Sequence, residues 1–430
     1  MGRDARIKSL RRQARQQQDH VEEQLGLALS DALLELREEV HEFVVASGLK
    51  VVQAMLERDR VRLCGPKHAR QPGREVMRAG TVPGEVVLGG RRVAVQRPRV
   101  RRVAGGEVRL PTYEWARRED PLGKRAVEQM VVGVATRKYA RSLEPLPEEF
   151  EARGTSRSAV SRRFVARTQA ELDAWLEQPL GEVDLVALLL DGIEFGEHTL
   201  VVAMGIDSTG QKHPLAIREG STENATLCRE LLRSLVGRGL AADRSLLVVI
   251  DGGKGLHSAV RQVFGEWALI QRCQVHKMRN VLDQLPESRR PFVRAAIRRA
   301  YAMDDADKAE KTLQRLATSL DEAYPSAAAS LREGLKETLT IVDLGLGPTL
   351  RRSLSTTNAI ESMFATVRIV TGRVTRWRGG RMVQRWGLAG IREAEKKFRR
   401  LMGKADMPRL VTALRERDRE RAGKRAAAAA

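Results

Sequence analysis

Leu188-Leu189-Leu190-Asp191 and Val248-Val249-Ile250-Asp251 are two apolar runs that each end in an aspartate, and they decide the fold. Runs of this kind are typical of buried strands, predicted here over residues 183–190 and 245–250. A carboxylate at the C-terminal end of a buried strand opens into the crevice where α/β proteins bind ligands. A turn that simply follows a strand would explain one such aspartate, but it does not explain why two separate strands both end in one. Because neighbouring carboxylates repel each other, the pair predicts a site for a divalent cation.

The segments around these two runs predict a mixed five-stranded sheet with flanking helices. Further strands are predicted at residues 199–206, 213–218 and 268–272, with a helix over 223–236. Three strands, helix, strand, helix, strand is the order of a ribonuclease-H-like core. Residues 287–340 are rich in Arg, Ala, Leu and Glu, so they predict an all-α insertion into this α/β core.

A third acidic residue, Glu361, lies in the first turn of a helix predicted over residues 355–372. The run Ser355-Thr356-Thr357-Asn358 is expected to cap that helix. Arg368 follows two turns later on the same face, so a metal-binding glutamate would have a phosphate-binding arginine beside it. A Glu/Arg pair on a helix is usually a solvated surface feature. Here the Glu361/Arg368 pair indicates a functional site only because it occurs together with the two aspartates.

The charge balance of the chain predicts a polyanionic partner. Lys and Arg number 76 against 55 Asp and Glu, which gives a net charge of +21. An acidic membrane surface is the competing explanation. The sequence has no apolar run long enough for a transmembrane helix, and its basic N-terminus lacks the apolar stretch of a signal peptide. Three dispersed cysteines, Cys64, Cys228 and Cys273, fit a reducing cytoplasm better than a disulfide scaffold.

An arginine-rich hairpin is the first predicted DNA-binding segment. Gly89-Gly90 separates two short strand-like runs, residues 85–88 and 91–96. Phosphate contacts are expected from three arginines at the end of this hairpin: Arg97, Arg99 and Arg101. The alternative is a solvated, charged edge that discourages aggregation.

Residues 123–170 predict a three-helix unit with the pattern of a helix-turn-helix. Ser156 can cap the last helix, and the outward face of that helix would present four polar side chains to base edges and phosphates in a major groove: Arg157, Ser161, Arg162 and Arg163. Any small helical bundle can imitate this pattern.

A further basic segment follows the helix that carries Glu361. Its arginines Arg373, Arg376 and Arg378 are expected to contact DNA. Trp377 and Trp386 are interleaved with arginines. These tryptophans either stack on a flipped or single-stranded base or pack the last helix onto the core.

Four runs of the sequence resemble the bacterial insertion-sequence transposases of the Mutator-like type. They are LLLDGIEF from residue 188, VVIDGGKGL from 248, QRCQVHKMRNVL from 271 and STTNAIESMFATVR from 355. The resemblance covers roughly residues 115–400, in the family's order. It implies a DDE recombinase whose catalytic domain is ribonuclease-H-like. It also implies that Asp191, Asp251 and Glu361 are the catalytic triad and the ligands of two Mg²⁺ ions, which Mn²⁺ can replace.

The same resemblance assigns Cys273 and His276 to the family's C/D-x2-H element, close to the active centre. A single Cys-x2-His pair lacks the other two ligands of a closed structural zinc site. Cys64 and His68 could supply them in principle but lie in a different segment. We therefore expect His276 to touch substrate or orient a carboxylate rather than to bind zinc.

The resemblance further implies a reaction and its partners. The protein would bind the terminal inverted repeats of its own mobile element, nick the ends with water and join the 3′-OH to another phosphodiester. Its partners would be double-stranded DNA, at the element ends and the target, and further copies of the chain. A homodimer or higher oligomer would form through a helix predicted over residues 20–60. The protein would work at the nucleoid in the bacterial cytoplasm, not at a membrane.

Two alternatives remain open at this point. One is a DNA-binding regulator or domesticated relic without strand-transfer activity, and the other is a nuclease that cuts but never joins ends. The predicted organisation is a helical region (1–62), a basic β-hairpin region (63–114), a helix-turn-helix domain (115–175), the first part of the core (176–285), a helical insertion (286–350), the second part of the core (351–403) and a charged, partly disordered tail (404–430).

Overall fold

The computed structural model describes residues 46–67, 73–88, 91–118, 121–143, 152–153, 156–222 and 224–429. The chain divides into two compact units, Met1–Arg167 and Thr168–Ala430, and each is described by itself. The helix predicted over residues 20–60 falls largely outside the described residues, as do the Gly89-Gly90 turn and His68. The seven-part organisation stays a prediction.

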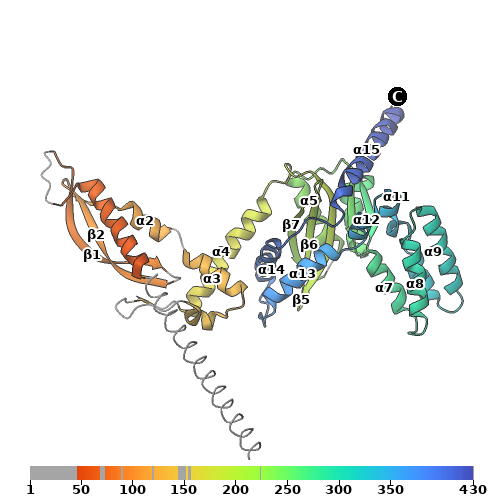
Figure 1. Cartoon of the computed structure of the whole chain (residues 1–430), viewed down its shortest axis with the longest axis horizontal. Helices are drawn as coiled ribbons and strands as arrows, with labels where there is room; N and C mark the ends of the chain where they lie inside the picture. The colour runs from red at the N-terminus through yellow and green to blue at the C-terminus, as the bar shows by residue number, and fades with distance from the viewer. Residues whose placement is uncertain are drawn as a thin grey trace, which may run out of the picture. The chain divides into compact units, whose positions relative to one another are not determined.

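The basic hairpin of the first unit is longer than predicted. Its antiparallel strands are β1 (Val76–Leu88) and β2 (Arg91–Arg102), drawn in orange in Figure 1. Pro83 and Pro98 both lie inside these strands. Pro83 is tolerated because β1 lies at the edge of the described sheet, and the pairing is irregular opposite Pro98.

Alternation of side chains along β2 gives this hairpin its small core. Val93 and Val95 are buried, while the residues between and beside them are exposed, as expected for a strand with one covered face. The covering side chains include Leu49, from a helix over residues 46–64, and Ala116. Two short strands, β3 (Glu107–Val108) and β4 (Ala152–Arg153), also pair with β2.

Three further helices and a 3-10 helix complete the first unit and lead into the second. They are α2 (Pro111–Arg118), α3 (Pro121–Val131), the 3-10 helix Thr136–Ser142 and α4 (Arg157–Glu177). Buried Ala126, Tyr139 and Val160 pack together and join α3, the 3-10 helix and α4 in one cluster. The predicted second helix is thus a 3-10 helix, and whether this cluster is a helix-turn-helix stays a prediction.

The second unit contains the mixed five-stranded sheet that the sequence predicts. Its strands are β5 (Leu185–Phe195), β6 (His198–Asp207), β7 (Lys212–Gly220), β8 (Leu246–Ile250) and β9 (Ala268–Arg272). The spatial order is β7-β6-β5-β8-β9. Neighbours among β5, β6 and β7 are antiparallel, whereas β8 and β9 run parallel to β5.

The sequence predicts that this strand ends before Asp191, but β5 continues to Phe195. The reason is that its two neighbours differ in length. The pairing with β8 covers Ala187 to Leu190 only, while the antiparallel pairing with β6 continues to Phe195. Asp191 therefore lies where β5 loses its parallel neighbour, and its side chain still opens at that edge.

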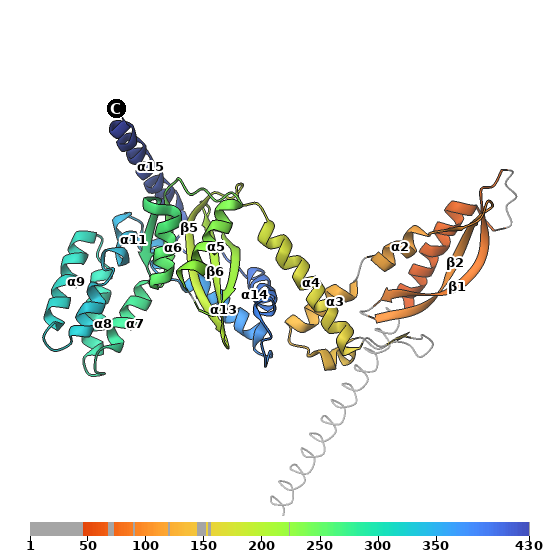
Figure 2. The same ribbon diagram turned by 180° about the vertical axis from the view of Figure 1, so that it is seen from behind.

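Helices cover both faces of this sheet. Leu188 and Leu190 of β5 belong to a core completed by two helices, α5 (Ala225–Gly237) and α6 (Lys254–Phe264). Both helices are labelled in the view of Figure 2. Leu189 faces the opposite core, which includes α13 (Asn358–Thr371) and α14 (Gly380–Glu395), blue in Figure 1. Because both faces are covered, β5 is apolar without interruption from Leu185 to Leu190 instead of alternating.

The segment between the sheet and α13 is helical, as predicted for the insertion. Its helices are α7 (Gln274–Asp283), α8 (Arg290–Tyr301), α9 (Ala306–Leu320), α10 (Pro325–Arg332), α11 (Thr340–Asp343) and α12 (Pro348–Leu354). Their buried residues belong to the same apolar cluster as α13 and one face of the sheet, so the segment shares the core of the second unit.

The charged tail begins with a helix that is anchored to this core. Helix α15 runs from Met407 to Ala429, and Met407, Leu410 and Leu414 are buried. Asp418 accepts a hydrogen bond from the Ser245 backbone N–H at 2.7 Å, just before β8. This part of the tail is therefore ordered, because apolar residues at helical spacing interrupt its charges. Within the described residues, no helix is long and apolar enough to cross a membrane.

Candidate active site

Asp191 and Asp251 lie side by side at one edge of the sheet. Strands β5 and β8 are parallel and pair Leu190 with Ile250. Each of these two residues is followed directly by an aspartate, Asp191 or Asp251. The Gly192 N–H donates to Asp191 Oδ1 at 2.9 Å, and the Gly253 N–H donates to Asp251 Oδ1 at 2.8 Å. The register of the sheet thus brings the two predicted acids together, and backbone hydrogen bonds orient them.

Glu361 reaches the same place from α13. Its helix packs against β5, and the Gln274 N–H donates to the Ser355 carbonyl at 2.9 Å, which joins the starts of α7 and α13. The Thr357 hydroxyl donates to Glu361 Oε1 at 2.7 Å. Thr357 is the residue that begins the helix, but its side chain caps no backbone N–H. Within the expected capping cluster it is the Thr356 hydroxyl that accepts from a backbone N–H, that of Asn358, at 3.4 Å. Thr357 holds the glutamate instead.

The electrostatics of Asp191 show that the three acids interact. Asp191 is only 9% exposed. Burial and the negative charge of Asp251, with a smaller effect of Glu361, raise the pKa of Asp191 to about 7. A buried carboxylate surrounded by like charges gains most from a cation bound between them. The donor set of three carboxylates suits Mg²⁺, which prefers oxygen ligands.

Cys273 and His276 border these acids. The Cys273 N–H donates to the Ile250 carbonyl at 2.7 Å, so the cysteine stands at the same sheet edge, one strand further along. His276 Nε2 lies 3.7 Å from Glu361 Oε1. The Thr357 hydroxyl lies 3.6 Å from Cys273 Sγ and 3.4 Å from His276 Nδ1. Thr357 therefore sits among the cysteine, the histidine and the glutamate.

Cys273 and His276 also perturb each other. The hydrogen bond with Cys273 and the negative charges nearby outweigh burial and raise the pKa of His276 to about 9. Burial disfavours the Cys273 thiolate, but hydrogen bonds from His276 and Thr357 outweigh it and lower the thiol's pKa. Each residue of the pair thus favours the charged form of the other.

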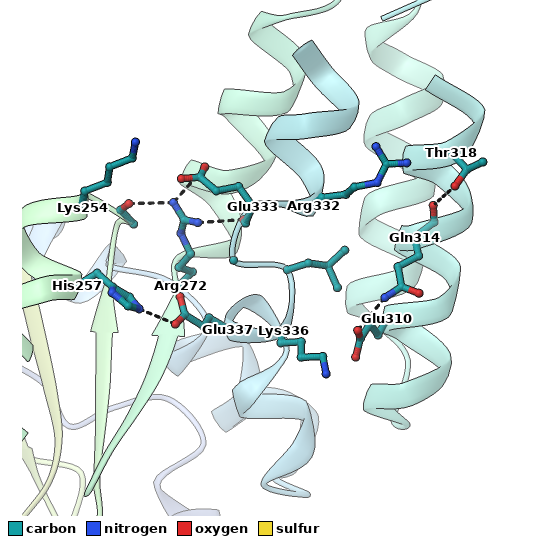
Figure 3. A pocket seen from close by; sticks show the side chains of 13 residues that line it. Lys254, His257, Arg272, Glu310, Gln314, Thr318, Arg332, Glu333, Lys336 and Glu337 are labelled. Carbon is teal, nitrogen blue, oxygen red and sulfur yellow. Dashed lines mark hydrogen bonds and ion pairs between the residues drawn. The ribbon is translucent and has the colours of Figure 1, made fainter. Parts of the chain in front are cut away.

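Arg272 clamps the loop that follows Asp251. This arginine is only 7% exposed, and its guanidinium donates to the Gly252 carbonyl at 2.8 Å and the Glu333 carbonyl at 2.9 Å. Gly252 and Gly334 both have positive φ, and a Cβ on either would collide with the guanidinium. The arginine therefore fits between two glycines and ties the Asp251 loop to the end of α10 (Figure 3).

An open cavity of about 840 Å³ begins at Gly252 and extends to α9 and α10. Its wall includes His257, hydrogen-bonded to Glu337 at 2.7 Å, and the lysines Lys254 and Lys336 (Figure 3). Of the residues next to the three acids, Gly252 lines this cavity, whereas Asp191, Asp251 and Glu361 do not.

The predicted DNA-binding residues differ in how exposed they are. On α4, Arg157, Ser161 and Arg162 are exposed and Arg163 is half-buried. In the hairpin, Arg101 is exposed, but Arg97 and Arg99 both pair with Glu107, at 3.0 and 3.3 Å. On α13 and just after it, Arg368, Arg373, Arg376 and Arg378 are exposed.

The two tryptophans pack against the protein. Trp386 is buried on α14, and Trp377 contacts Phe195 edge-to-face with ring centroids 5.0 Å apart. Packing, the plainer of the two interpretations, accounts for both. The sequence alone did not reveal that Thr357 donates a hydrogen bond to Glu361, nor that Arg272 ties the Asp251 loop to the end of α10. The sequence signals that could have pointed to them are that Thr357 lies in the Ser-Thr-Thr-Asn run and that Arg272 directly precedes Cys273.

Comparison with known proteins identifies the family of the chain. The sequence model described as Transposase, Mutator family, matches residues 19–398. The transposase for insertion sequence element IS6120 of Mycolicibacterium smegmatis is 35% identical over 244 residues, which are 55% of this chain and 74% of that protein. The transposase for ISRM5 of Rhizobium meliloti is 29% identical over 324 residues, 74% of this chain and 79% of the relative. The transposase for IS256 in transposon Tn4001 of Staphylococcus aureus is 28% identical over 288 residues, 64% and 71% of the two chains. The chain belongs to the Mutator family of transposases.

Proposed function

We propose that this protein is a DDE-type DNA transposase that binds the terminal inverted repeats of its own element, nicks the ends and joins the 3′-OH to another phosphodiester. The observation that carries the proposal is the convergence of three acids. Leu190 and Ile250, the residues just before Asp191 and Asp251, pair in neighbouring parallel strands. Glu361 comes from a helix that packs against β5, and it lies beside Cys273 and His276, of which Cys273 is bonded to Ile250 at the same edge. Membership of a transposase family supports the same chemistry.

The architecture supports the proposal in two ways. A sheet of order β7-β6-β5-β8-β9, with three antiparallel strands and two added in parallel, suits a ribonuclease-H-like core. The helical segment between Asp251 and Glu361 then corresponds to an insertion in that core. DNA binding is assigned to the exposed face of α4 and to the arginines that follow α13.

Divalent cations fit the donor set described above. Asp191, Asp251 and Glu361 would hold two Mg²⁺ ions, or Mn²⁺ in their place. Bound there, the ions supply activation of the attacking oxygen and stabilisation of the leaving oxygen. The protein's own contribution is position: backbone N–H groups orient the two aspartates, Thr357 holds Glu361, and Arg272 fixes the Asp251 loop.

The first test is substitution of one acid. Asp251→Asn keeps the shape of the side chain but removes its charge, so we expect Mg²⁺-dependent nicking of the element's terminal repeats to fall at least about a hundredfold. DNA binding, measured by mobility shift, is expected to persist. Asp283→Asn changes the same charge at an exposed position of α7 and serves as the control. If Asp251→Asn cuts as well as the parent, the assignment of the acids is wrong.

A strand-transfer assay separates the proposal from its alternatives. A pre-nicked element end with a free 3′-OH is offered together with a target plasmid. Joined products support a transposase. Cutting without joining would identify a nuclease, and binding without either reaction in Mg²⁺ or Mn²⁺ would identify a regulator or relic.

A further inference from the structure

Three different metal-ligating side chains meet beside the aspartates. Ligand atoms of Cys273, His276 and Glu361 all lie within 4.8 Å of one another. The cysteine follows β9, the histidine lies in the first turn of α7 and the glutamate in the first turn of α13. The sequence contains only the Cys-x2-His pair, and the packing of α13 against the sheet supplies the third ligand.

The spacing is close to that of a tetrahedral zinc site. Zinc bonds of about 2.0–2.3 Å at tetrahedral angles separate neighbouring ligand atoms by roughly 3.5 Å. His276 Nε2 and Glu361 Oε1 are already 3.7 Å apart. The buried sulfur of Cys273 is held at the end of a strand, while the Glu361 side chain is 37% exposed and can move inward by the distance that remains.

The donor set selects a softer metal than Mg²⁺. Thiolate and imidazole suit Zn²⁺, whereas Mg²⁺ prefers carboxylates, phosphates and water. Three protein ligands leave a fourth position open, as in sites that exchange a water molecule. Thr357, which lies among all three side chains, is the nearest neutral group to that position.

We propose that Cys273, His276 and Glu361 form a Zn²⁺ site that overlaps the site of the three acids. Zn²⁺ bound there takes Glu361 as a ligand, so the glutamate is no longer free to hold Mg²⁺ with Asp191 and Asp251. Zn²⁺ therefore acts as an inhibitor. The inhibition rests on the proposed function, but the metal site itself does not.

Binding is tested on the full chain without DNA. Co²⁺, which substitutes for Zn²⁺, gives a thiolate-to-cobalt charge-transfer absorption only when a cysteine sulfur is a ligand. We expect this absorption in the parent, its displacement by Zn²⁺ and its loss in Cys273→Ser. Cys64→Ser and Cys228→Ser remove the two other buried free cysteines and serve as matched controls that keep the absorption. Absence of the absorption in the parent, or its persistence in Cys273→Ser, would overturn the site.

A second variant keeps the test decisive if Cys273→Ser folds poorly. Glu361→Gln alters a partly exposed side chain, so it is expected to fold, and its Zn²⁺ affinity is expected to fall at least about tenfold by competition with a chromophoric chelator. An unchanged affinity would exclude Glu361 as a ligand and with it the overlap.

Inhibition is measured separately, as nicking in excess Mg²⁺ with added Zn²⁺. We expect nicking to fall as Zn²⁺ fills the site and to recover when a chelator removes it. If Co²⁺ and Zn²⁺ bind as expected but nicking is unaffected, the overlap is wrong although the metal site stands. If the parent never nicks DNA, the proposed function fails, and the spectroscopic result still decides the metal site.

Discussion

At the scale of single residues, the active-site loop depends on an arginine enclosed by two glycines. The guanidinium of Arg272 contacts Gly252, next to Asp251, and lies against Gly334 beyond α10. It also lies 3.5 Å from the Glu333 carboxylate. A buried arginine is costly unless its N–H groups are satisfied, so the two backbone carbonyls it binds are part of what keeps it there. The same bonds fix the conformation of the loop that carries Asp251.

We therefore predict that Gly252→Ala lowers the free energy of unfolding by about 2–4 kcal/mol, from strain at φ +104° and from collision with Arg272. Gly345→Ala is the matched control, because its φ of +63° is also positive but nothing lies near its Cβ. It is expected to cost only about 1 kcal/mol. Denaturant unfolding of both variants measures the difference.

Arg272→Ala provides the second arm of this test. If the arginine is the obstacle, Gly252→Ala costs less in the Arg272→Ala background than in the parent, by a double-mutant cycle. Equal costs in both backgrounds would mean that strain at Gly252 alone explains the effect.

At the scale of elements, the turn between β6 and β7 shows how one side chain ends a strand. Asp207 Oδ1 accepts from the Thr209 and Gln211 backbone N–H groups at 2.8 and 2.9 Å. Its other oxygen lies 2.8 Å from His213 Nε2. Asp207 is thus a turn residue whose side chain bonds backbone on the far side of the turn. Aspartate suits this position because its short side chain can bond backbone two residues ahead.

Asp207→Ala is predicted to destabilise the protein by about 1.5–3 kcal/mol at neutral pH. Burial opposes ionisation of Asp207, but hydrogen bonds from His213, Thr209 and Gln211 outweigh it and hold the pKa below its usual value. A depressed carboxyl pKa contributes stability above the unfolded-state pKa of about 3.9, and that stability is lost as pH falls through the folded-state pKa.

The difference in unfolding free energy between parent and Asp207→Ala is therefore expected to be largest near neutral pH and to shrink as pH falls below about 4. Thermal or denaturant unfolding at several pH values measures it. A difference that does not change with pH would show that the ionised carboxylate is not the source of the stability.

At the scale of the whole molecule, the net charge of +21 and membership of a transposase family point to DNA as the partner. Not every arginine is available for it. Arg97 and Arg99 share Glu107, whereas Arg157 and Arg162 on α4 are exposed. An arginine already paired with a carboxylate has to give up that pair to bind a phosphate. Helix α4 is thus the better candidate for direct phosphate contacts.

For the double variant Arg157→Ala/Arg162→Ala we predict a weaker salt dependence of DNA binding. Each lost phosphate contact lowers the slope of log K against log salt by about 0.9, so the slope should fall by about 2. Arg298→Ala/Arg299→Ala removes the same charge from exposed positions on α8 and is the control. An equal fall in both variants would mean that the slope reports overall charge and not contacts of α4.

The sequence by itself determined the five strands, the helical segment after them and the edge at which Asp191 and Asp251 meet. These features depend on local composition: a strand covered on both faces is apolar throughout, and parallel neighbours end at the same edge. The true end of β5 was beyond sequence reasoning, because it depends on the length of its antiparallel partner.

Only the tertiary structure decided what surrounds the acids. Thr357 bonds Glu361, and Arg272 fits between Gly252 and Gly334. Cys273 and His276 have Glu361 as a neighbour only because α13 and the helical segment pack against the sheet. These residues are far apart in the chain or have no periodic pattern. Their partners are set by packing across the core, which no local stretch of sequence specifies.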